Sequence, residues 1–221
     1  MSTLFDLLAK GGLTMVPIVG FSIATVSCAL ERSWFWYRLL SRENRVVHQV
    51  LEAAQVDLTQ ARSIAQQSAD LPIGRFLLAP LQLNQPTPET FRLAMEGSLD
   101  DEFVHMQKGD KLLETVIAVS PLLGLLGTVT GLILTFGNLN IGSSGDSEQT
   151  TAAAAGIGEA LITTAGGMVV AIMALLIFRV LVVLQSQQMN YFTKVGTQLE
   201  LIYRQQWYEP AQRMNAMVEG K

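Results

Sequence analysis

Residues 149–178 read "QTTAAAAGIGEALITTAGGMVVAIMALLIF", and Glu159 is the only charged side chain in this run. About 20 apolar residues in a helix cross the roughly 30 Å hydrocarbon core of a bilayer, so the run is long enough to span a membrane. Two further windows, residues 11–30 and 115–136, also lack charge over a full span length. Because a helix satisfies its backbone polar groups internally, we predict an all-α integral membrane protein. The expected transmembrane helices are residues 11–30, 115–137 and 152–184.

The composition of the whole chain agrees with this class. The 221 residues are 49% hydrophobic and only 15% charged, which is too apolar for an ordinary soluble domain of this length. The net charge of −4 offers no basic field for nucleic acid, so we expect no nucleic-acid partner. No Cys/His metal spacing, phosphate-binding glycine loop or paired nucleophile and base stands in the sequence, so we expect no enzyme activity, metal or cofactor.

Basic residues indicate how the chain crosses the membrane, because Lys and Arg are retained on the cytoplasmic side. Of the 15 Lys and Arg residues, only Lys10 precedes the first window, and none lies in residues 138–151. Residues 1–10 and 138–151 are therefore expected on the outer side of the membrane. Basic residues follow the first and third windows, at Arg32, Arg38, Arg42, Arg45, Lys194, Arg204, Arg213 and Lys221. The expected cytoplasmic parts are residues 31–114 and the tail, residues 185–221.

The cytoplasmic parts have the pattern of helices. Asp57 and Thr87 are helix-capping residue types, and Pro88 and Glu89 suit the first turn of a helix. Since no proline follows Pro88 until Pro121, we expect one helix to begin at Pro88 and continue through the second span. The third span likewise continues into the tail, so both helices extend into the cytoplasm.

The segment "ERSWFWYR", residues 31–38, follows the first span. Trp and Tyr favour the headgroup level of a membrane, while arginines there can face water. We therefore expect interfacial anchors at Arg32, Trp34, Trp36 and Tyr37.

Small and hydroxyl-bearing residues line one face of the second span. Ser120, Gly124, Thr128, Gly131 and Thr135 recur at helical spacing, and Gly127 and Thr130 widen the stripe. Small residues let helices approach closely in lipid, so Gly124, Gly127 and Gly131 are expected packing positions. Each threonine has two interpretations: it lines a polar path, or its hydroxyl bonds its own helix backbone.

The third span repeats this arrangement around a carboxylate. Gly156, Glu159, Thr163, Gly166 and Val170 share one face, and Gly156 and Gly166 are expected packing positions. A carboxylate in lipid costs a few kcal/mol or more, so such groups face a bundle interior or a water-filled route. Loss of hydration favours the neutral form of a carboxyl group, so Glu159 is a candidate for binding and releasing a proton. In the alternative, the span starts only at Ala160 and Glu159 lies at the outer interface.

With three spans and these two stripes, the chain resembles the MotA/TolQ/ExbB proton channel family, on its ExbB/TolQ branch. The resemblance rests on "SPLLGLLGTVTGLI", residues 120–133, and "GIGEALITTAGGM", residues 156–168. It implies a homopentamer in the inner membrane around a central pore. The pore would hold the spans of an ExbD/TolR-like dimer, and proton entry would drive that partner's motion. It further implies a TonB/TolA-like protein and TonB-dependent transport.

The resemblance also implies a proton pathway. Glu159 stands at the family's helix-three glutamate, Thr128 at the threonine of its "GT" motif, and Thr164 at its helix-three threonine. Helical periodicity instead places Thr163 on the face of Glu159, with Thr164 about 140° away. Both threonines remain candidates. The chain departs from the family pattern at Ala155 and Met173, where proline is usual, and at Arg179, where asparagine is frequent.

Three functions remain to be distinguished. The resemblance favours a proton-conducting motor subunit with Glu159 as the relay group. A non-conducting membrane scaffold would need the packing glycines but not the carboxylate. A secondary transporter would need more spans or broken helices around a midplane site, which the sequence does not indicate.

Overall fold

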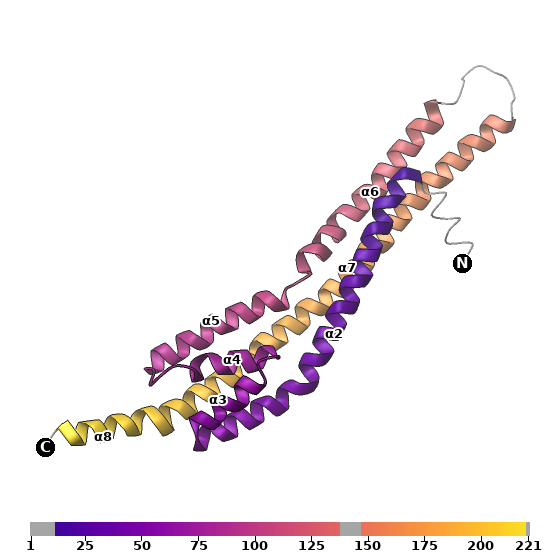
Figure 1. Cartoon of the computed structure of the whole chain (residues 1–221). Helices are drawn as coiled ribbons and strands as arrows, with labels where there is room; N and C mark the ends of the chain where they lie inside the picture. The colour runs from indigo at the N-terminus through magenta and orange to yellow at the C-terminus, as the bar shows by residue number, and fades with distance from the viewer. Residues whose placement is uncertain (1–11, 138–146, 220–221) are drawn as a thin grey trace. The chain divides into compact units, whose positions relative to one another are not determined.

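The computed structural model describes residues 12–137 and 147–219, and every regular element within them is helical (Figure 1). The expected segment 1–10 and most of the expected loop 138–151 lie outside the described residues. The helices are α2 (Gly12–Val56), α3 (Leu58–Gln67), α4 (Pro72–Leu81), α5 (Pro88–Met106), α6 (Asp110–Gly137), α7 (Ser147–Ile202), the π-helix η1 (Tyr203–Tyr208) and α8 (Glu209–Glu219).

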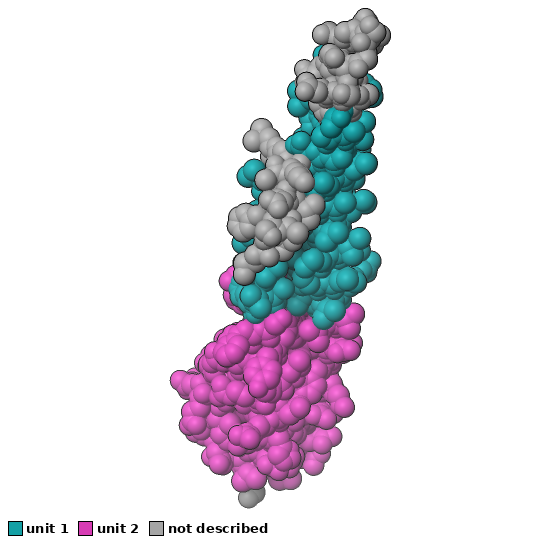
Figure 2. All heavy atoms as spheres, turned by 90° about the vertical axis from the view of Figure 1, so that its right-hand side faces the viewer, with its two compact units in different colours: residues 1–32, 109–181 teal, residues 33–108, 182–221 magenta. Residues whose placement is uncertain are grey.

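The chain divides into two compact units, which Figure 2 shows in two colours. The first unit comprises residues 1–32 and 109–181, and the second comprises residues 33–108 and 182–221. Helices α2 and α7 contribute to both units, whereas α6 belongs to the first. The second unit contains α3, α4, α5, η1 and α8.

Three stretches of the described helices are long and apolar enough to cross a membrane, as predicted. They are Thr14–Val56, Pro88–Gly137 and Ala153–Met214. Helix α2 continues far beyond residue 30, because neither glycine nor proline interrupts the chain between Gly20 and Val56. Helix α7 begins at Ser147, inside the expected loop.

The expectation of one unbroken helix from Pro88 through the second span is wrong. Helix α5 ends at Met106 and α6 begins at Asp110, with Gly109 between them at a φ of 95°. This left-handed conformation favours glycine. A Cβ at Gly109 would also lie 2.7 Å from the Cys28 sulfur, so a side chain has no room there.

The core of the second unit forms where α4 meets the end of α7. Phe76 of α4 and Phe192 of α7 are buried with their ring centroids 5.1 Å apart, and Gly196 leaves room for the Phe76 ring. The predicted caps are confirmed: Asp57 accepts a hydrogen bond from the Thr59 amide at 2.7 Å, and Thr87 accepts one from the Thr90 amide at 3.2 Å. These caps start α3 and α5, which both pack against α4.

Buried and half-buried polar groups also hold the second unit together. The Arg75 guanidinium donates two hydrogen bonds of 2.5 Å to the Glu102 carboxylate and a third, of 3.0 Å, to the Ala69 carbonyl oxygen. The hydrogen bonds to Glu102 raise the pKa of Arg75 against the opposing effect of burial. Elsewhere in the second unit, the Gln188 side chain of α7 donates a hydrogen bond to the carboxylate of Glu43 in α2, and both residues are buried.

The four expected interfacial anchors divide into two pairs. Trp34 and Tyr37 are each 71% exposed, as a membrane-facing anchor requires. Arg32 and Trp36 are only 5% and 3% exposed, so the expectation that they face the membrane boundary does not hold in this chain. They lie on the inward face of α2, which the aromatic composition of "ERSWFWYR" alone did not distinguish.

Candidate functional site

Helices α6 and α7 approach each other closely along their small residues. A Cβ added to Gly124 of α6 would lie 2.9 Å from the Thr164 Cα of α7. A Cβ added to Gly167 of α7 would lie 2.5 Å from the Ser120 carbonyl oxygen. Neither position has room for a methyl group, so the two backbones pack directly, as small residues permit in a membrane. We call this line of contact the α6–α7 seam.

The other expected packing glycines also face neighbouring helices. Gly131 faces Ala160, and Gly156 faces the Thr135 hydroxyl, both along the seam. Gly127 is close to Thr163 and to Thr14 of α2, and Gly166 faces the Met15 side chain of α2. Gly167 was not among the expected packing positions, although it stands seven residues after Ala160, which is two helical turns along the same face.

The two candidate threonines of α7 differ in where their hydroxyls point. Thr164 is half-buried and donates a hydrogen bond of 2.7 Å to the Gly124 carbonyl oxygen across the seam. Thr163 is 1% exposed, lies against Gly127, and donates a hydrogen bond of 3.0 Å to the Glu159 carbonyl oxygen. Thr163 therefore contacts the backbone of Glu159 from inside the helix bundle, while Thr164 is the threonine with accessible surface.

The threonines of α6 bond to their own helix. The Thr128 hydroxyl donates to the Leu125 carbonyl oxygen at 2.7 Å, and the Thr135 hydroxyl donates to the Gly131 carbonyl oxygen at 2.8 Å. Thr128 nevertheless keeps part of its surface exposed. The neighbouring Ser120 is fully buried, and its hydroxyl has no hydrogen-bond partner among the described residues.

Glu159 lies well inside α7, twelve residues after the helix begins at Ser147, and not in a loop before it. Its side chain is exposed on the surface of this single chain. It forms no ion pair with another described residue. The Glu159 side chain is therefore accessible from outside its own chain.

No residues of the described chain are grouped in a way that would bind a metal ion. Three or more His, Cys, Asp or Glu side chains never gather within the described ranges. The candidate site is therefore a carboxylate with neighbouring hydroxyls on two close helices.

Comparison with known proteins bears directly on these helices. Residues 68–194 match the model of the MotA/TolQ/ExbB proton channel family, and this range includes Glu159, Thr128, Thr163 and Thr164. The chain belongs to this family. A Synechocystis sp. protein with the name biopolymer transport protein ExbB-like 1 is 64% identical over 211 residues, which cover 96% of this chain and 83% of that protein.

Two other relatives place the chain on the ExbB/TolQ branch of the MotA/TolQ/ExbB family. The Synechocystis sp. protein named ExbB-like 3 is 37% identical over 92% of this chain and 96% of its own length. The biopolymer transport protein ExbB of Xanthomonas campestris pv. campestris is 40% identical over 47% of this chain and 36% of that protein. Family membership and the three apolar helices together make the chain a multi-pass membrane protein of a proton channel family.

Proposed function

We propose that the chain is the proton-conducting subunit of an inner-membrane motor that couples the proton motive force to movement of an ExbD/TolR-like partner. One observation carries the proposal: Glu159 lies inside a membrane-crossing helix, exposed on the chain's surface and without an ion pair among the described residues. A carboxylate facing hydrocarbon costs at least a few kcal/mol. Glu159 therefore needs a partner or water from outside its own chain.

An assembly supplies both. The intrachain contacts at the seam already occupy Gly124, Gly131 and Gly167, whereas the Glu159 side chain is exposed and remains available to other subunits. The family resemblance gives the form of the assembly as a homopentamer whose central pore holds the spans of a partner dimer. In that arrangement Glu159 binds and releases protons beside the partner's own carboxylate.

The hydroxyls have separate roles in this proposal. Thr164 and Thr128 are both partly exposed, which supports a place for them along the proton route. Thr163 is closed off inside the bundle and supports the helix packing instead. Of the two threonines that the sequence left open, we therefore prefer Thr164.

The proposed energetics are sufficient for mechanical work. Each elementary charge that crosses the membrane releases about 2.3 kcal/mol per 100 mV, so a few protons supply a rearrangement of several kcal/mol. The positive-inside distribution of Lys and Arg supports a periplasmic N-terminus and a cytoplasmic second unit. We further propose that the motor serves TonB-dependent transport through a TonB/TolA-like protein.

The coupling can be tested with the assembled complex. We expect a neighbouring gene to encode a protein with one apolar span and an aspartate near the start of that span. This protein should copurify with the chain, and native mass spectrometry should show five copies of the chain with two copies of the partner. A fluorescent label on that partner should report motion when a pH gradient is applied across proteoliposomes. A partner that copurifies but shows the same motion with and without the gradient would contradict the coupling.

The scaffold hypothesis keeps one observation in its favour, namely the tight glycine seam. A scaffold predicts that Glu159→Gln leaves cellular function intact while Gly124→Leu abolishes assembly. The motor predicts that both changes abolish function but that only Gly124→Leu prevents assembly. Growth complementation combined with native mass spectrometry of the two variants separates the two hypotheses.

A further inference from the structure

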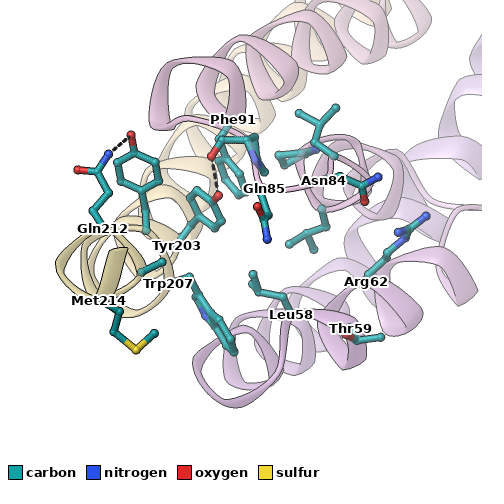
Figure 3. Close-up of a pocket in the computed structure, with 16 residues that line it drawn as sticks. Leu58, Thr59, Arg62, Asn84, Gln85, Phe91, Tyr203, Trp207, Gln212 and Met214 are labelled. Carbon is teal, nitrogen blue, oxygen red and sulfur yellow. Dashed lines mark hydrogen bonds between the residues drawn. The ribbon is translucent and has the colours of Figure 1, made fainter. Parts of the chain in front are cut away.

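The second unit contains a pocket that the motor function does not use. Its volume is about 780 Å³, within the range of about 300–1,000 Å³ that small-molecule sites occupy. Residues of α3, of the loop between α4 and α5, of η1 and of α8 line it (Figure 3). We call it the π-helix pocket.

Two irregular backbone features lie in the walls of the π-helix pocket. Tyr203, Trp207 and Tyr208 line it from η1, and π-helical segments are rare and frequently found at functional sites. Gln85 lines it from the loop with a φ of 46°, the only positive φ of a non-glycine residue among the described ones. Such a conformation costs free energy and is concentrated at ligand sites.

The aromatic wall of the pocket offers an apolar surface of fixed position. The Tyr203 hydroxyl donates to the Pro86 carbonyl oxygen at 2.6 Å, and the Trp207 indole donates to the Ala54 carbonyl oxygen at 2.9 Å. The Phe91 ring stacks on the Tyr203 ring with centroids 4.3 Å apart and an interplanar angle of 8°. Because the polar atoms of these rings are already bonded, the rings present apolar surface to a ligand.

The opposite wall of the pocket is cationic. Arg62 of α3 is the only charged residue in the lining, and it forms no ion pair with another described residue. Figure 3 shows Gln85 between Arg62 and the aromatic side chains, where its amide group can also donate a hydrogen bond. An arginine fork matches the geometry of a carboxylate, and no acidic side chain of the lining competes for it.

We propose that the π-helix pocket binds a small organic acid with an aromatic or branched apolar body. Its carboxylate contacts Arg62 and Gln85, and its apolar body lies against Tyr203 and Trp207. This ligand class follows from the separation of charge and apolar surface within one pocket. The proposal does not depend on proton conduction.

The test compares two probes of nearly the same shape that differ in charge, a carboxylate and its amide. N-acetyl-L-phenylalanine carries a carboxylate, whereas N-acetyl-L-phenylalaninamide is neutral and nearly identical in shape. Binding of each to the full chain in lipid nanodiscs is measured by saturation-transfer NMR and titration. We expect the acid to bind about tenfold more tightly than the amide, which is the contribution of one charge-assisted hydrogen bond at a half-open site.

Two variants and one control locate the binding. Arg62→Gln should reduce the affinity for the acid to that for the amide, and Ala211→Trp should abolish binding of both, because exposed Ala211 lines the pocket. Arg45→Gln changes an exposed arginine of the same unit outside the lining and should bind like the wild type. Circular dichroism confirms that each variant is folded. Equal affinity for acid and amide in the wild type, or acid binding that survives Ala211→Trp, would overturn the proposal.

Discussion

The Thr164 hydroxyl donates a hydrogen bond of 2.7 Å to the carbonyl oxygen of Gly124, joining α7 to α6 at a point where their backbones approach closely. A Cβ at Gly124 would lie 2.9 Å from the Thr164 Cα, so only glycine permits this bond. The threonine at the family's motif position is therefore fixed to the second helix, while the threonine chosen by helical periodicity is enclosed in the bundle.

This difference predicts opposite results from two isosteric substitutions. Thr164→Val removes the interhelical hydrogen bond and a partly exposed hydroxyl, so it should lower proton flux several-fold and destabilise the protein by about 1 kcal/mol. Thr163→Val exchanges a hydroxyl that solvent cannot reach for a methyl group of similar volume, so it should retain most of the flux. Proton uptake by proteoliposomes and thermal unfolding in detergent measure both effects. The preference for Thr164 fails if Thr163→Val is the more damaging change.

The seam predicts an unusually costly glycine-to-alanine substitution. In Gly167→Ala the new methyl group would lie 2.5 Å from the Ser120 carbonyl oxygen, so α6 and α7 would have to separate. Overpacking of this kind costs about 1–3 kcal/mol. The matched control is Gly20→Ala, because a Cβ at Gly20 has no neighbouring atom within 4 Å. Thermal unfolding of the two variants in detergent should show a lowered transition for Gly167→Ala alone.

An ion pair of the second unit predicts a pH-dependent stability. Burial alone would raise the pKa of Asp70, but hydrogen bonds and charge from Arg38, at 2.9 Å, and from Arg42, at 3.0 Å, outweigh burial and lower it. Because the pKa of Asp70 is lower in the folded state, its charge stabilises the protein at pH values above the ordinary Asp pKa of about 4. This stabilisation is lost as the pH falls through the pKa of the folded state.

Asp70→Asn should therefore be less stable than the wild type at pH 7, by at most about 1 kcal/mol because the pair is partly exposed. The difference between the two proteins should become smaller as the pH falls below about 4. Urea unfolding at pH 7 and pH 3 measures it. A stability difference that is the same at both pH values would show that Asp70 acts through something other than its charge.

The sequence predicted where the helices lie along the chain better than it predicted which side of each helix is buried. Charge-free windows and the caps at Asp57 and Thr87 are local signals, so the number of spans and two helix starts followed directly. The break at Gly109 also had a local signal, a glycine followed by Asp110, but the absence of proline outweighed it in the prediction.

The faces of the helices depend on tertiary contacts that one sequence does not reveal. Periodicity grouped Glu159 with Thr163, but it could not show which side of α7 meets α6 and α2, and in the structure Thr163 is buried while Glu159 is exposed. For the same reason, the burial of Arg32 and Trp36 was not foreseen. The π-helix at Tyr203–Tyr208 had no recognised sequence signal at all.

The central claim is that Glu159 carries protons, and proton flux into proteoliposomes tests it most directly. The chain is reconstituted with its single-span partner as wild type, as Glu159→Gln, and as Glu114→Gln, a control at another exposed glutamate of the same unit. Native mass spectrometry confirms that all three assemble equally. We predict that Glu159→Gln reduces the flux to that of protein-free liposomes while Glu114→Gln leaves it unchanged. A flux in assembled Glu159→Gln equal to that of the wild type would contradict the claim.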